Sequence, residues 1–151
     1  MKSLLIPPPL QGLFCAGAMW ALATNLPSLS YAFVGQRPLG FIIIGGGLCL
    51  DIISILKFRQ SRTTVNPMHL EKASALVTTG LYTVSRNPMY LGLVVILSGW
   101  AVLLGNPLNI LTLGCFVLLI NRLQIIPEES VLLAKFGNQY SAYTKKVRRW
   151  I

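Results

Sequence analysis

The stretch "PMYLGLVVILSGWAVLLGNPLNILTLGCFVLLI", residues 88–120, contains no charged side chain in 33 residues. Gly105, Asn106 and Pro107 divide it into two apolar pieces, and each piece approaches the ~20 residues that a helix needs to cross a bilayer. Water is absent from the interior of a membrane, so backbone groups there must be satisfied within helices. The stretch therefore predicts two membrane helices joined by a tight turn.

The composition of the whole chain agrees with this prediction. Of its 151 residues, 54% are apolar and only 11% are charged, which excludes a typical soluble domain. Four apolar segments approach spanning length: 10–33, 39–56, 89–104 and 108–126. We predict an all-α integral membrane protein, with about four transmembrane helices arranged as two hairpins, that forms a single polytopic domain over residues 1–151.

The formal charge of +9 lies mostly in two regions. One is the polar loop around residues 57–88 and the other is the C-terminal tail, whereas the turn at 105–107 carries no charge. The basic residues in these regions are Lys57, Arg59, Arg62, Lys72, Arg86, Lys135, Lys145, Lys146, Arg148 and Arg149. This distribution indicates membrane topology and no nucleic-acid partner. We expect a multi-pass protein of a bacterial cytoplasmic membrane, with both termini and the 57–88 loop cytoplasmic.

After Pro127 the chain changes from apolar to amphipathic. Pro127 fits the first turn of a helix, and Glu128 and Glu129 follow where acids stabilise a helix N-terminus. Apolar residues then recur at steps of four, four, three and four, at Leu132, Phe136, Tyr140, Tyr143 and Val147. We predict a separate amphipathic helix lying along the cytoplasmic face of the membrane. Gly137 weakens this helix and marks a bend.

The second span contains two unusual features. Gly45, Gly46 and Gly47 predict a surface where another helix packs closely. Asp51 is the only acid embedded in a span, and two interpretations remain open. It is either a functional intramembrane acid or a carboxylate that extends to the nearby end of the span.

The sequence offers few other reactive groups. Cys15, Cys49 and Cys115 lie in separate apolar segments without metal-ligand spacing, so we interpret them as small buried apolar residues and expect no metal. The single histidine, His69, is interpreted as a solvated loop residue. Pro7 to Pro9 interrupt the first apolar stretch, so we expect a membrane span there and no cleaved signal.

One group of polar residues gathers where the third span begins and the fourth ends. The predicted hairpin brings Arg86, Asn87 and Tyr90 to the same side of the membrane as Glu128 and Glu129, and Arg122 adds a second cation there. The residues alone leave two readings open. Each side chain is ordinary at a membrane boundary, and together they form a possible site.

The segment "GLYTVSRNPMYLG" (80–92), followed by "PEESVLLAKFGNQYSAYTKKVRRW" (127–150), resembles the isoprenylcysteine carboxyl methyltransferase family and related phospholipid methyltransferases. The resemblance covers residues 76–151. It implies a membrane methyltransferase that uses S-adenosylmethionine and acts on a lipophilic or small thiol, carboxyl or amine acceptor entering from the bilayer. The family's motif usually reads Arg-His-Pro, and here Asn87 replaces the histidine. An amide forms hydrogen bonds but does not titrate near neutrality.

The resemblance also implies roles for individual residues. Arg86, Asn87 and Tyr90 would be catalytic, and Glu128 and Glu129 would hold cofactor hydroxyl or ammonium groups while Arg86 holds its carboxylate. The full set of implied cofactor-binding residues is Gly80, Tyr82, Arg86, Asn87, Pro88, Tyr90, Gly92, Glu128 and Glu129. Two alternatives remain: an NADPH-dependent membrane reductase of related architecture, and a non-enzymatic scaffold that binds anionic lipid.

Overall fold

The computed structural model describes residues 6–60 and 75–151, and these residues form helices and connecting turns with one isolated β-bridge. The His69 prediction lies outside the described residues. The helices are α1 (Pro8–Asn25), α2 (Gln36–Gln60), α3 (Pro88–Leu104), α4 (Asn109–Ile120) and α5 (Ile126–Lys146). Short 3-10 turns occupy Pro27–Leu29 and Gly80–Thr83, the latter called η3, and η4 (Asn121–Ile125) is a π-helical turn. The all-α prediction is confirmed for this part of the chain.

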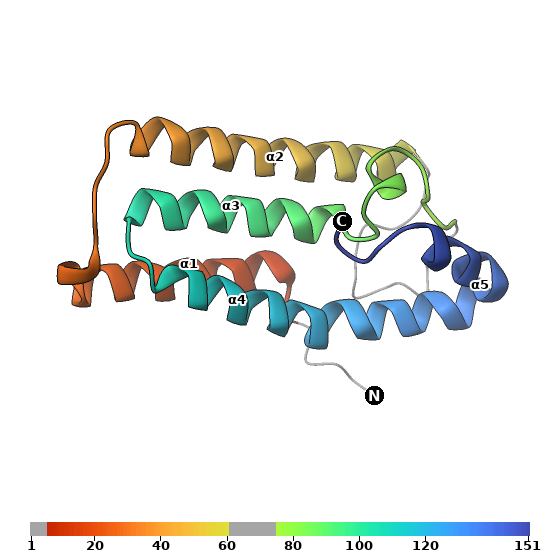
Figure 1. Cartoon of the computed structure of the whole chain (residues 1–151). Coiled ribbons are helices and arrows are strands. Elements are labelled where there is room, and N and C mark those ends of the chain that lie inside the picture. Colours follow the sequence, from red (N-terminus) through yellow and green to blue (C-terminus); the bar gives the residue numbers. More distant parts are fainter. Residues whose placement is uncertain (1–5, 61–74) are drawn as a thin grey trace.

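Helix α3 lies at the centre of the bundle, with α2 on one side and α1 and α4 on the other (Figure 1). α3 and α4 form the predicted hairpin, joined through Gly105, whose φ of 65° suits a glycine after a helix. α1 and α2 follow one another in the chain, but α2 packs on α3 while α1 packs on α3 and α4. The prediction of a first hairpin from these two helices is therefore wrong, because α3 lies between them.

Glycines make the contact between α2 and α3 unusually close. A Cβ atom added at Gly47 would lie 2.6 Å from the carbonyl oxygen of Gly92, and one at Gly99 would lie 2.7 Å from that of Gly40. Such small residues let helix backbones touch, which favours helix association in lipid. Of the three consecutive glycines, only Gly47 makes this contact, since Gly45 and Gly46 have nothing within 4 Å of an added Cβ.

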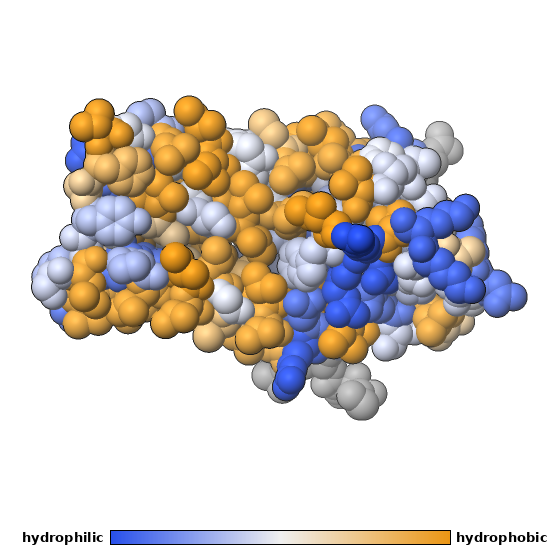
Figure 2. Space-filling model, in the orientation of Figure 1, coloured by the Kyte–Doolittle hydropathy of each residue, from blue (hydrophilic) through white to orange (hydrophobic). Residues whose placement is uncertain are grey.

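The face of the bundle seen in Figure 2 is largely apolar, except at the end where α5 and the C-terminus lie, which is hydrophilic. In the described part of the chain, two helical segments are long and apolar enough to cross a membrane, Gln36–Lys57 and Asn109–Lys146, and Pro88–Leu104 is a shorter apolar helix. Cys15 is buried, but Cys49 and Cys115 are exposed. The burial prediction was wrong for these two cysteines, because in lipid the outer face of a helix is as suitable for an apolar side chain as the inner face.

No separate helix begins at Pro127. α4, η4 and the first part of α5 form one continuous rod (Figure 1), and the backbone stays helical at Asn121 and Ile126. A proline inside a helix lacks one hydrogen-bond donor and crowds the preceding turn. The wider π-helical turn directly before Pro127 accommodates both effects, so the helix passes through a residue that the sequence interpretation had used as a boundary.

The predicted bend does occur at Gly137, where φ is 47° and ψ is −120°. Beyond it the chain turns back toward the bundle (Figure 1). The apolar stripe of α5 is buried there, since Tyr140, Tyr143 and Val147 pack with Leu76 and two further stripe residues, Leu132 and Phe136. The prediction that this stripe faces the membrane is therefore wrong, because the protein itself covers it.

Candidate functional site

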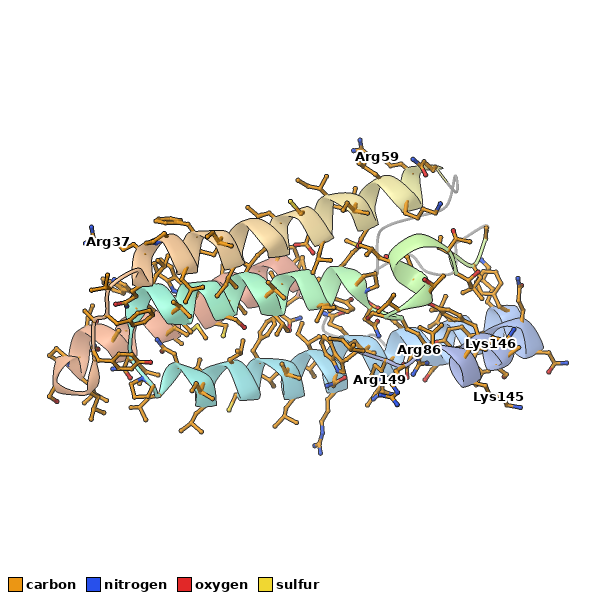
Figure 3. The ribbon with its side chains drawn as sticks, turned by 45° about the horizontal axis from the view of Figure 1, so that its top comes forward. Arg37, Arg59, Arg86, Lys145, Lys146 and Arg149 are labelled. Atoms are coloured by element: carbon orange, nitrogen blue, oxygen red, sulfur yellow. The ribbon has the colours of Figure 1, made fainter. Side chains whose placement is uncertain are left out.

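Most charged groups gather at one end of the bundle. The end of α2, the start of α3, the second half of α5 and the C-terminus all lie there (Figure 1). Among the labelled basic residues, Arg59, Arg86, Lys145, Lys146 and Arg149 lie toward this end and Arg37 lies at the other (Figure 3). These labelled residues of the loop and tail thus meet at one end, as the sequence predicted, whereas Arg62 and Lys72 lie outside the described residues. The side of the membrane that this end faces stays a prediction.

The C-terminal segment is fastened to the residues just before α3. The backbone amide of Arg86 donates to the carbonyl of Arg148 at 3.0 Å, and Ser85 and Arg148 form a parallel β-bridge. The Asn87 side-chain amide donates to the carbonyl of Arg149 at 3.0 Å. An uncharged amide at position 87 thus holds the tail across the start of α3, a role that requires no titration.

Glu129 lies at the centre of a charge cluster, which we call the Glu129 cluster and define as Glu129, Arg86, Arg149 and Tyr140. Arg149 donates from Nε to Oε1 at 3.0 Å and from Nη2 to Oε2 at 2.7 Å. Arg86 Nη1 lies 3.1 Å from Oε1 and 3.5 Å from the Tyr140 hydroxyl. The hydrogen bond to Glu129 raises the pKa of Arg149. Forked contacts of this kind are among the stronger polar interactions in proteins.

Tyr90 and Glu128 form a second polar pair beside this cluster. The buried Tyr90 hydroxyl donates to Glu128 Oε1, which joins α3 to α5. Tyr82 of η3 lies close by. Its pKa is raised by burial first and also by Tyr143, Glu128 and Asp51, while a hydrogen bond with Ser54 lowers it. The Tyr82 hydroxyl is therefore influenced by carboxylates of two different helices, α2 and α5.

Three other predicted site residues, Pro88, Gly80 and Gly92, lie in three different environments. Pro88 is buried in the first turn of α3, and Gly80 lies against the aliphatic part of Lys57 with φ at 67°. Gly92 is covered by α2, because an added Cβ would lie 2.1 Å from Asp51 Oδ1. The space left by the missing side chain of Gly92 is thus used in helix packing, and its assignment to cofactor binding stays a prediction.

Arg122 does not join the site. Its side chain is exposed, and in residues 6–60 and 75–151 it makes no ion pair or hydrogen bond with Glu128 or Glu129. The π-helical turn η4, which contains Arg122, changes the helical register before Glu129, so spacing along an ideal α-helix did not place this side chain correctly.

Sequence reasoning missed the contribution of the C-terminal residues to the site. It assigned Arg149 only to the charge distribution that indicates topology, and it gave Trp150 no role in the site. In the structure Arg149 binds Glu129, and Trp150 packs against the core cluster that contains Tyr90 and Ile125. The available signal was Arg148 and Arg149 directly before Trp150. From sequence alone, this pattern cannot be told apart from a membrane-interface anchor.

The cluster presents a set of groups suited to a ligand with several charges and hydroxyls. Carboxylates accept from hydroxyl or ammonium groups, and a guanidinium can fork onto a carboxylate. The Nε atom of Arg86 is buried and has no hydrogen-bond partner. Arg86 and Glu129 contact each other, so in this conformation each of them occupies part of the other's capacity for a ligand. Among the described residues, no group of three potential metal ligands occurs.

Comparison with known proteins identifies the relatives of this chain. The model of the family described as phospholipid methyltransferase matches residues 36–139. An uncharacterized protein of Haemophilus influenzae is 49% identical over 63 residues, which are 42% of this chain and all of that protein. A protein-S-isoprenylcysteine O-methyltransferase of Schizosaccharomyces pombe is 31% identical over 145 residues, which are 91% of this chain and 61% of that protein.

A further protein-S-isoprenylcysteine O-methyltransferase, from Tribolium castaneum, is 37% identical over 127 residues, 78% of this chain and 44% of that protein. The chain thus spans about 60% or less of these two named methyltransferases. The family match covers Arg86, Asn87, Tyr90, Glu128 and Glu129 together with the helices that carry them. It extends over most of the chain, and we conclude that this protein belongs to the phospholipid methyltransferase family.

Proposed function

We propose that this protein is a membrane methyltransferase that uses S-adenosylmethionine and holds it beside the Glu129 cluster. The family uses this methyl donor. The observation that carries the proposal is the meeting of Glu129, Arg86 and Arg149 with the Tyr90–Glu128 pair at one end of an apolar bundle. These residues come from two matched segments far apart in the chain, and they supply both signs of charge.

The chemistry of the residues fits the cofactor. The amino-acid end of S-adenosylmethionine has a carboxylate and an ammonium group, and its ribose has two hydroxyls. Arg86 has a buried Nε atom without a partner, so its guanidinium has donor capacity left for a carboxylate. Glu128 can accept from hydroxyl or ammonium groups, while the aromatic side chain of Tyr90, which is hydrogen-bonded to it, can tolerate a cation.

Protein groups would contribute mainly alignment and exclusion of water. When bound, S-adenosylmethionine supplies a methyl group on a sulfonium, and a lone pair of the acceptor forms the new bond to carbon while the carbon–sulfur pair returns to sulfur. Such a displacement depends on in-line placement of the two reactants. Arg86 and Glu128 would fix one reactant, and Trp150, packed over the core beside Tyr90, would keep water from it.

The acceptor in this proposal is a lipophilic or small molecule with a thiol, carboxyl or amine group that enters from the bilayer. The names of two relatives, both protein-S-isoprenylcysteine O-methyltransferases, support isoprenylcysteine as one candidate. Large apolar side chains are exposed on the helices, including Phe41, Ile42 and Ile52 of α2, and they offer a surface for an apolar tail.

Ligand-dependent unfolding tests this proposal. S-adenosylhomocysteine should raise the melting temperature of the detergent-purified protein, because a ligand that binds only the folded state stabilises it. NADPH serves as the control ligand at equal concentration. Stabilisation by NADPH alone would favour the reductase alternative, and stabilisation by neither would favour the lipid-binding scaffold.

A further inference from the structure

Residues 148–150, just after the end of α5, form a short non-helical segment that we call the strap. The strap crosses the start of α3. The backbone amide of Arg86 donates to the carbonyl of Arg148 at 3.0 Å. One residue further along, the Asn87 side chain donates to the carbonyl of Arg149, also at 3.0 Å. The strap therefore lies against the segment that leads into α3, where the candidate cofactor site is located.

The side chains of the strap occupy groups of that site. Arg149 contacts both carboxylate oxygens of Glu129, with Nε 3.0 Å from Oε1 and Nη2 2.7 Å from Oε2. Arg86 adds a third donor, since its Nη1 atom lies 3.1 Å from Oε1. With three donors on two oxygens, Glu129 has most of its acceptor capacity in use. An ammonium or hydroxyl group of the cofactor can bind Glu129 well only after one of these donors leaves.

Arg149 is the donor that can leave at lower cost. Its side chain is 37% exposed, whereas that of Arg86 is 14% exposed. Water replaces the contacts of an exposed guanidinium, so an exposed ion pair contributes little net free energy. A more buried guanidinium that loses its partner has less water to replace it. Exchange of Arg149 for a ligand ammonium would also leave Glu129 between two cations.

The backbone of the strap is held by local contacts. Ser85 and Arg148 form an isolated β-bridge, and the Ser85 hydroxyl lies 3.4 Å from the carbonyl of Arg149, near the upper limit of a hydrogen bond. An isolated bridge lacks the additional strands that make a sheet stable. Release of the strap would therefore break local hydrogen bonds and leave the close contact between α2 and α3 intact.

We infer that the strap is a gate of the cofactor site and that Arg149 holds it closed. In the closed arrangement Arg149 binds Glu129, and when S-adenosylmethionine enters, its ammonium group takes the place of the Arg149 guanidinium. Arg86 stays on Glu129 in both arrangements. The contact between Arg149 and Glu129 is thus autoinhibitory, because it competes with the cofactor for one carboxylate. This inference rests on the proposed function.

Removal of the Arg149 guanidinium tests the inference. If Arg149 competes with the ligand, its removal strengthens binding, and if Arg149 itself holds the ligand, its removal weakens binding. Arg149→Met keeps an unbranched side chain and removes every donor. Arg148→Met removes the same charge from the neighbouring exposed residue and is the matched control. Surface plasmon resonance of S-adenosylhomocysteine on the immobilised, detergent-purified full chain gives the association rate and the Kd.

We expect Arg149→Met to bind S-adenosylhomocysteine about two- to fivefold more tightly than the wild type, because a partly exposed ion pair no longer has to be broken. The gain should lie in the association rate, since binding no longer waits for the strap to open. Arg149→Lys keeps the charge without the fork and should lie between the two, whereas Arg148→Met should match the wild type. Weaker binding in Arg149→Met would overturn the inference.

A reversible crosslink tests the movement itself. Ser85→Cys combined with Arg148→Cys places two thiols across the β-bridge, in a protein whose Cys15, Cys49 and Cys115 are changed to Ala. Oxidation should slow the association of S-adenosylhomocysteine about tenfold or more, because entry requires the gate to open, and reduction should restore it. Unchanged association in the oxidised protein, with the crosslink verified by mass spectrometry, would also overturn the inference. A crosslink that does not form in the folded protein would contradict the contact on which the inference depends.

Failure of the proposed function has a different signature. In that case S-adenosylhomocysteine binds neither the wild type nor any variant, whether oxidised or reduced, and the inference fails together with the function. Binding of this ligand to the wild type and to Arg149→Met with equal rate and affinity would instead leave the proposed function in place and overturn the gate alone.

Discussion

The α2–α3 contact and the Glu129 cluster hold the same molecule together in opposite ways. In the first, glycines bring two backbones together, and a Cβ at Gly47 would lie 2.6 Å from the carbonyl oxygen of Gly92. In the second, side chains from α5, the segment before α3 and the C-terminus meet through an ion-pair network around Glu129. The first contact depends on shape and the second on charge.

This difference separates scaffold from site. Close backbone packing has a single good arrangement, because adding or removing atoms there disturbs the fit. A carboxylate between two arginines has alternatives, since a ligand carboxylate or ammonium can replace one partner and leave the other in place. Under the proposed function, the α2–α3 contact supplies a rigid frame, and the Glu129 cluster supplies partners that a charged cofactor can exchange.

The largest expected effect comes from disrupting the close contact between α2 and α3. In Gly47→Leu the new side chain has no space against α3, and we expect a loss of at least about 3 kcal/mol of stability, since overpacking forces the backbones apart. Gly46→Leu is the matched control, because Gly46 has nothing within 4 Å of an added Cβ. Thermal unfolding in detergent measures both, and equal stability of the two variants would contradict the packing described here.

Removing the charge of Glu129 should lower the stability less than Gly47→Leu does, but it should also weaken ligand binding. Glu129→Gln leaves Arg86 and Arg149 facing each other, and we expect about 1 to 3 kcal/mol of destabilisation. The Kd for S-adenosylhomocysteine should rise more than tenfold if the cluster holds the cofactor. Titration of labelled ligand into the purified variant measures this.

The control for that change is Lys146→Gln, which also removes one charge but at an exposed position, and its affinity should match the wild type. Wild-type affinity in Glu129→Gln would remove the cluster from the cofactor site. Weak binding of anionic lipid in Lys146→Gln, with cofactor binding absent throughout, would instead favour a lipid-binding scaffold.

The bend that brings the tail back to the cluster should also be sensitive to substitution. Gly137 has a positive φ of 47°, which a residue with a Cβ adopts only with strain. Gly137→Ala should lose about 1 to 2 kcal/mol of stability and expose the tail to protease. Gly114→Ala, in a helix with open space around it, should do neither. Limited proteolysis followed by mass spectrometry measures the difference.

The smallest effect concerns one hydrogen bond between α5 and η3. Tyr143 donates to the carbonyl of Tyr82 at 2.6 Å in a buried position. Tyr143→Phe should cost about 1 kcal/mol, because it leaves that carbonyl unsatisfied while keeping the ring in place. Chemical denaturation of the two proteins side by side measures it, and an unchanged midpoint would show that solvent or another donor replaces the hydroxyl.

Local sequence chemistry determined much of this protein. The charge-free run of residues 88–120 and its interruption at Gly105 to Pro107 predicted two helices and a tight turn, because hydrophobicity and turn propensity act over short distances. The motifs around Arg86 and Glu129 predicted that both signs of charge would meet at one end of the bundle. Gly137 predicted the bend, because a glycine allows backbone angles that other residues avoid.

Only the tertiary structure decided which faces those elements use. The apolar stripe of α5 could have met lipid or protein, since both are apolar, and the structure places it against Leu76. Pro127 could have ended a helix, but the preceding π-helical turn let it continue. The partner of Glu129 at Arg149 depends on a contact between residues far apart in the chain. Such contacts follow from how the helices pack together, which local periodicity does not encode.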